Sequence, residues 1–256
     1  MIRTRELALI LVLLLACITQ AQEQAPRQQL KIAAYNVLNL FDVFDDPYTE
    51  DEVTRVKPRG EIEQVAALLR QIDADVIAFS EVENEGVLRA VARELLPDMG
   101  YAYVAASHSN DGRGIRLGVM SRLPIVSQTS HRFTELTLPG DERTWRFARD
   151  FVRFELRVSA SQNLDLYVVH FKSKRSEPDD PQSGRWRLAE AVAARRIIEA
   201  RRREKPGNWT LVAGDFNDTP ESDPVTHLLA RVEVDAPILT DLHKDSPAEQ
   251  WITYLR

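Results

Sequence analysis

Cysteine is almost absent from this chain, which has a single one, Cys17, among its 256 residues. A lone cysteine forms no intramolecular disulfide and supplies no cysteine-based metal site. Cys17 also lies inside the apolar N-terminal segment, so the domain that follows it contains no thiol. The stability of that domain must therefore come from the packing of its core.

The sequence also lacks an excess of positive charge, an internal repeat and a second long hydrophobic run. Its formal net charge of -6 at pH 7 argues against a protein that coats nucleic acid by charge alone. A nuclease is not excluded, because metal ions can bring phosphate to an acidic pocket. Beyond the N-terminal segment, about 230 residues remain for one large α/β domain or two small ones.

The N-terminus has the pattern of a targeting segment. Arg3 and Arg5 precede an unbroken apolar run over residues 7–16, which is too short to span a membrane comfortably. Cleavage after Ala21 would make residues 1–21 a signal peptide. Cleavage before Cys17 would instead make a lipid-anchored bacterial lipoprotein, and an uncleaved membrane anchor is the third alternative.

All three alternatives predict an exported protein that is secreted, periplasmic or lipid-anchored at the cell envelope. Residues 22–29 are polar and are expected to form a short tether. Residues 30–256 are expected to form the functional domain.

Short apolar segments alternate with helical patterns in this domain. Hydrophobic periodicity predicts helices over residues 61–72, 84–96 and 185–203, with Asn84 as a helix cap. Buried strands are predicted over residues 30–37, 75–79, 101–106, 115–121, 164–169 and 209–213. Residues 151–158 alternate between polar and apolar, which predicts a half-buried antiparallel strand. The mixture predicts an α/β fold in which two sheets pack together with helices outside.

Polar side chains follow the predicted strands where each of them ends. Asn36, Glu81 and His170 end three strands, and Asp215 and Asn217 follow a fourth. Strand ends of this kind converge on one rim when a sheet is largely parallel. Asp215 and Asn217 would share side-chain parity if the extended geometry persisted. The alternative is a local turn in which Asp and Asn bond only nearby backbone.

Several short motifs occur in one order along the chain: "NVLNLFD", "SEVEN", "DGRGIRLGVMSRLPI", "HFKSKR" and "GDFND". Together they resemble the endonuclease/exonuclease/phosphatase superfamily, specifically its secreted bacterial nuclease-like branch. The resemblance implies a DNase I-like, four-layer α/β sandwich of two packed mixed sheets flanked by helices. It also implies metal-dependent hydrolysis of phosphoric esters.

The resemblance implies a role for each strand-end residue. Glu81 is the main metal ligand and Asn36 orients it or the phosphate; Glu83 is a neighbour with the same strand parity. The metal implied is Mg²⁺, with Mn²⁺ or Ca²⁺ as alternatives, and it needs few protein ligands because it keeps several waters. His170 stabilises charge on the phosphorus centre. Asp215 and Asn217 orient the attacking water and bind a phosphate oxygen.

Two basic residues are candidates for binding the substrate phosphate: Arg113, in a glycine-flanked loop, and Lys172, just beyond His170. A solvent-exposed position is the alternative for both. The arginines of the helix over residues 185–203 could follow a nucleic-acid backbone. Interleaved glutamates, among them Glu190, favour a solvated helical face instead, and Trp186 is either core or a stacking platform.

The chain departs from the family pattern at its C-terminus. The resemblance implies a final strand with an aspartate and a further Asp-His pair that acts as general base, and neither follows here. His243 comes too early, and Asp241 matches a position of unclear role. We therefore expect a fragment that lacks its C-terminal strands, with an intact but inactive family member as the alternative.

The most direct hypothesis is an exported Mg²⁺-dependent phosphodiesterase that acts as an endonuclease or exonuclease on DNA or RNA. A sphingomyelinase-like enzyme or a phosphatase for small phosphate esters is the alternative, with residues 41–44 as a small candidate for membrane docking. A non-catalytic cell-surface binding module is a third. A monomer is expected, and no protein partner is evident.

The fragment hypothesis predicts that the coding sequence continues beyond Arg256 and encodes the missing histidine motif. Sequencing the gene past this codon checks it, and a genuine stop codon there would contradict it.

Overall fold

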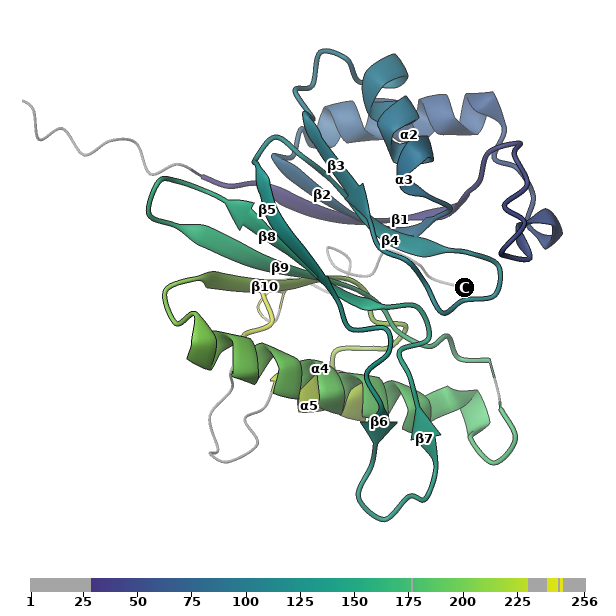
Figure 1. Cartoon of the computed structure of the whole chain (residues 1–256), viewed down its shortest axis with the longest axis vertical. Helices are drawn as coiled ribbons and strands as arrows, with labels where there is room; N and C mark the ends of the chain where they lie inside the picture. Colours follow the sequence, from purple (N-terminus) through teal and green to yellow (C-terminus); the bar gives the residue numbers. More distant parts are fainter. Residues whose placement is uncertain (1–28, 176, 230–238, 244, 246–256) are drawn as a thin grey trace, which may run out of the picture. The chain divides into compact units, whose positions relative to one another are not determined.

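Two four-stranded β-sheets form the framework of residues 32–256 (Figure 1). The computed structural model describes residues 29–175, 177–229, 239–243 and 245, and it divides the chain into two units, residues 1–31 and 32–256. The predicted signal peptide, the Cys17 anchor and most of the tether lie outside the described residues. Among the described helices, none combines the length and the apolar character that crossing a membrane requires.

The first sheet has the strand order β1-β2-β4-β3 and the second has the order β10-β9-β8-β5. In each sheet one pair, β1–β2 or β9–β10, is parallel and the other pairs are antiparallel. The strands of the first sheet are β1 (Ile32–Leu40), β2 (Val76–Val82), β3 (Tyr103–Ala106) and β4 (Arg116–Ser121). Those of the second are β5 (Ile125–Ser130), β8 (Phe151–Arg157), β9 (Asn163–His170) and β10 (Trp209–Asp215).

Helices cover the outer face of each sheet, which gives four layers (Figure 1). Over the first sheet lie α2 (Arg59–Ile72) and α3 (Glu85–Ala90), the latter continued by the π-helical turn η2 (Val91–Leu95). Over the second lie α4 (Gly184–Glu204) and α5 (Asp223–Leu229). The remaining elements are the 3₁₀ turns η1 (Asp51–Val53) and η3 (Pro181–Ser183) and the small β6–β7 hairpin (Leu136–Thr137 and Thr144–Trp145). The predicted fold class, two packed mixed sheets flanked by helices, is confirmed.

Local sequence signals explain the helices well. Asn84 caps α3 as predicted, because its Oδ1 accepts a hydrogen bond from the backbone N–H of Val87 at 2.9 Å. This bond satisfies one of the helix's free N–H groups. The strand β5 and the β6–β7 hairpin were not predicted.

The prediction that the strand over residues 151–158 is half-buried is wrong. β8 is antiparallel to both neighbours, but its polar side is covered as well, and Arg153 is only 9% exposed. Arg153 and Arg201 of α4 both pair with the buried Asp165 of β9, at 2.9 and 3.0 Å. The charged residues that suggested a solvated face are therefore paired beneath α4, where a buried charge needs a partner.

Gly214 allows β10 to lie close against β9. Its φ is +134°, and a Cβ added there would lie 2.2 Å from the carbonyl oxygen of Val169. The backbone conformation and the close approach both require glycine. This contact places the next residue, Asp215, opposite His170 in the register of the parallel pair.

We predict that Gly214→Ala lowers the free energy of unfolding by roughly 3 kcal/mol or more, through the clash and the strained backbone. Gly207→Ala is the matched control, because a Cβ at Gly207 meets nothing within 4 Å; its effect should stay within about 0.5 kcal/mol. Urea denaturation of both variants tests this, and equal midpoints would contradict it.

Candidate active site

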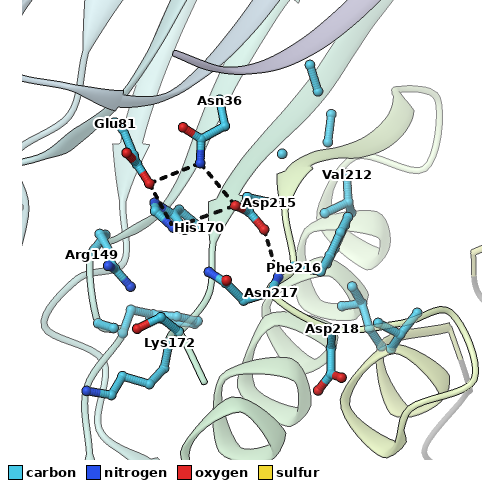
Figure 2. A pocket seen from close by; sticks show the side chains of 18 of the residues that line it. Asn36, Glu81, Arg149, His170, Lys172, Val212, Asp215, Phe216, Asn217 and Asp218 are labelled. Atoms are coloured by element: carbon cyan, nitrogen blue, oxygen red, sulfur yellow. Dashed lines mark hydrogen bonds and ion pairs between the residues drawn. The ribbon is translucent and has the colours of Figure 1, made fainter. Parts of the chain in front are cut away.

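One amide, from β1, joins the two sheets near the ends of β2 and β10 (Figure 2). Asn36 of β1 donates from Nδ2 to Glu81 Oε1 of β2 at 3.0 Å and to Asp215 Oδ2 of β10 at 3.1 Å. Its own Oδ1 accepts from the backbone N–H of Leu38 at 2.9 Å. The structure thus brings together three predicted site residues, and Asn36 orients the two carboxylates.

The backbone around these residues is irregular. β1 does not end at Asn36 as expected, but continues to Leu40 through a register shift, with Leu38 and Asn39 at φ of 53° and 58°. Glu81 has φ of 64° and lies at a second register shift, between Ser80 and Val82. Bulges re-aim side chains, and strained conformations in non-glycine residues occur often at functional sites. Here the irregularity directs Glu81 toward Asn36.

Glu81 and Glu83, which the sequence could not separate on parity, have different environments. Glu81 accepts from Asn36 and from the backbone N–H of Asn39, the latter at 3.1 Å. Glu83 turns toward the loop after β1, where it accepts from the backbone N–H of Asp42 at 2.6 Å. Burial raises the pKa of Glu83. The geometry therefore favours Glu81 as the site carboxylate.

His170 lies beneath the two site carboxylates and is only 3% exposed. Its Nε2 is 3.8 Å from Glu81 Oε1 and 3.8 Å from Asp215 Oδ2. Burial, followed by the nearby Arg149, lowers the pKa of His170 to about 4, although Asp215 acts in the opposite direction. The imidazole is therefore neutral at pH 7 and carries one N–H that it can donate.

Asp215 and Asn217 form the local turn that was the alternative to a site, and they belong to the site as well. The backbone N–H of Asn217 donates to Asp215 Oδ1 at 2.8 Å. Asn217 has φ of 51°, so the extended geometry ends and the expected shared parity is wrong. Its side-chain amide donates to the carbonyl of Phe171 at 2.9 Å.

Arg113 lines the site cavity but is held by a neighbouring carboxylate. Its Nε lies 3.2 Å from Asp111 Oδ1, and Asp111 also faces Arg149 Nε at 3.3 Å. Arg149 is 6% exposed and donates from Nη1 to the carbonyl of Phe171 at 3.2 Å. Sequence reasoning missed Arg149, and the available signal was an Arg-Asp pair directly before a predicted strand.

Lys172 also lines the cavity, with its ammonium engaged by protein groups. Nζ pairs with Glu177 and lies 4.5 Å from the centre of the Trp186 ring. Trp186 is half-buried on the cavity wall, and its Nε1 donates to the carbonyl of Arg146 at 2.8 Å. Trp186 is therefore a wall of the site, not a residue of the core.

Glu190 of α4 fixes the two segments that carry Arg149 and Lys172. Its carboxylate accepts from the backbone N–H groups of Ala148 at 2.8 Å and Lys172 at 2.7 Å. Glu190 is 0% exposed, and burial raises its pKa to about 7. The expectation that this helix face is solvated is wrong for Glu190 and also for Arg187, which pairs with Asp218 at 2.9 Å.

All seven predicted site residues line one cavity of about 2800 Å³, and Asp241 and His243 also border it. The seven are Asn36, Glu81, Arg113, His170, Lys172, Asp215 and Asn217. Two carboxylates held side by side, with an imidazole beneath them, form an oxygen-rich donor set that fits a hard divalent cation.

Glu190 should make stability depend on pH. Its folded pKa of about 7 exceeds the ordinary value of 4.5, so the folded state binds the proton more tightly than the unfolded state does. The stability that this proton provides is present below pH 4.5 and is lost as pH rises through 7. Relative to Glu190→Gln, the wild type should lose on the order of 3 kcal/mol between pH 4.5 and 8. Urea unfolding across this range measures the difference, and parallel curves for the two proteins would contradict the assignment.

Known proteins support the same architecture. The sequence matches the model of the Endonuclease/Exonuclease/phosphatase family over residues 31–242, whereas no curated protein matches it. The catalytic domain of human nocturnin with bound sulfate is similar in structure, with 15% identity, a TM-score of 0.53, and coverage of 77% of this chain and 68% of that one.

Two further solved structures are similar. Sphingomyelinase C from Streptomyces griseocarneus has 18% identity and a TM-score of 0.52, with coverage of 78% of this chain and 68% of that one. A beta toxin structure from Staphylococcus aureus has 14% identity and a TM-score of 0.57, with coverage of 78% and 70%. Because the family model spans most of the sequence, the chain belongs to the endonuclease/exonuclease/phosphatase family of phosphoric-ester hydrolases.

Proposed function

We propose that this chain is an exported, Mg²⁺-dependent phosphodiesterase that hydrolyses DNA or RNA. The observation that carries the proposal is the Asn36 bridge, which holds Glu81 and Asp215 together above the neutral His170. This arrangement offers carboxylates to a metal and an N–H donor to a phosphate oxygen in the same cavity. Export rests on the sequence pattern of the first residues.

Each side chain has a distinct task in the proposed mechanism. Glu81 would hold the metal, which when bound acts as a Lewis acid on the phosphoryl oxygens. His170 donates its N–H to a non-bridging phosphate oxygen as negative charge develops there. Asp215 orients the attacking water for in-line attack, and Asn217 keeps the turn that presents Asp215.

The cavity wall favours a polymeric, anionic substrate. Arg149 and Lys172 bring positive charge to the wall, and Trp186 adds an aromatic face. Aromatic side chains stack on bases, and cationic groups follow the phosphate backbone. The two cations are already engaged with Asp111 and Glu177, so a substrate phosphate would compete for them.

A lipid phosphodiesterase is the second candidate, and exposed apolar residues near the end of β1 favour it. Val43 and Phe44 are 75% and 76% exposed, whereas Phe41 is buried at 2%. The docking segment suggested by sequence is thus reduced to two exposed side chains. Binding to sphingomyelin liposomes, lost in Val43→Ser/Phe44→Ser, would favour this candidate over the nuclease.

We predict that Glu81→Gln reduces Mg²⁺-dependent cleavage of plasmid DNA at least about a hundredfold, because it removes a metal ligand. Glu83→Gln is the matched control, because Glu83 lies two residues away and bonds the backbone of Asp42 instead. It should retain activity within about tenfold once folding is verified by circular dichroism.

Equal cleavage by wild type and Glu81→Gln would refute the role of Glu81. A panel of DNA, RNA, sphingomyelin and small phosphate esters identifies the substrate class. Mg²⁺ binding without turnover of any member of this panel would support a non-catalytic binding module.

A further inference from the structure

A second acidic group lies in the loop between β1 and α2. One carboxylate oxygen from each of Asp45, Asp51 and Glu52 lies within 4.8 Å of the other two. None of the three is among the described residues that line the site cavity. The Mg²⁺ site proposed at Glu81 therefore does not account for this group.

Asp51 is the unusual member of the group, because it is only 5% exposed. Its Oδ2 accepts from the backbone N–H of Asp46 at 2.9 Å. Its Oδ1 is buried and has no hydrogen-bond partner among the described residues. A buried carboxylate oxygen without a partner is costly, so this atom points to a ligand.

The charge of the group is also uncompensated. No described lysine or arginine forms an ion pair with Asp45, Asp51 or Glu52, and Arg116 pairs with Asp46 at 3.3 Å instead. Lost hydration and the charge of Asp51 raise the pKa of Asp45. Carboxylates held close together repel one another, and a cation bound between them would remove that repulsion.

We propose that Asp45, Asp51 and Glu52 bind a Ca²⁺ ion. The donors are all oxygens, which excludes soft metals. Ca²⁺ accepts several carboxylates in irregular geometry with six to eight ligands, whereas Mg²⁺ demands a near-ideal octahedron. Asp45 and Glu52 are exposed, which leaves room for water to complete the shell.

The ion would act as a structural clamp on the loop. The backbone N–H of Asp42, at the start of this loop, already bonds to Glu83, two residues beyond Glu81. η1, which carries Asp51 and Glu52, lies before the start of α2. Bound Ca²⁺ would join Asp45 to η1 and fix the course of the intervening chain.

The test uses the full chain carrying Glu81→Gln, so that the catalytic metal does not contribute. Isothermal titration calorimetry with CaCl₂ should show one site in this parent, and Ca²⁺ should raise its melting temperature. Adding Asp45→Asn/Glu52→Gln should weaken Ca²⁺ binding at least about tenfold and abolish the thermal shift. Glu63→Gln/Glu94→Gln removes the same charge from exposed positions elsewhere and should behave like the parent.

Absence of Ca²⁺ binding by the parent at millimolar concentration would overturn the proposal, as would equal affinity in parent and double variant. Asp51→Asn, checked for folding without Ca²⁺, provides a second variant and should also lose the site. Because both readouts are independent of activity, a failed nuclease assay leaves this result unaffected.

Discussion

The hydrogen bonds from the single amide of Asn36 determine how the two sheets present their chemistry. They reach a carboxylate in each sheet, so Glu81 and Asp215 occupy fixed positions relative to one another. Without a donor between them, two neighbouring carboxylates would repel each other. The bridge keeps two negative groups together at a small separation, and such a pair offers oxygen ligands to a divalent cation.

Charged side chains between the second sheet and α4 are also held in place by partners on other elements. Arg153, Arg201 and Asp165 form a paired group beneath α4, and Arg187 of α4 pairs with Asp218, which follows β10. Such pairs contribute little net stability compared with apolar packing, but removal of one partner leaves a costly buried charge. They therefore specify where α4 lies on the sheet, while aromatic stacking such as that of Phe151 on Tyr167 supplies the apolar contact.

Sequence reasoning predicted the sheets, the main helices and the convergence of the strand ends, because hydrophobic periodicity and local caps encode them directly. It could not predict the bulge at Glu81, since a left-handed glutamate has no local signal. It misjudged α4, because arginines interleaved with glutamates look the same whether they face water or pair with partners distant in sequence. Glu190 was assigned to a solvated face for that reason, although it bonds Ala148 and Lys172. Arg149 was missed because its partners, Asp111 and Phe171, lie far from it in the chain.

Glu190 has a consequence for how this site could diversify. Its carboxylate accepts hydrogen bonds from main-chain N–H groups of the segments before β8 and after β9. Every residue except proline provides such an N–H group. The side chains at Ala148 and Lys172 could therefore be exchanged while the path of each segment is preserved. A cavity wall attached in this way can change its chemical character, and with it the molecules it accepts, without rebuilding the scaffold.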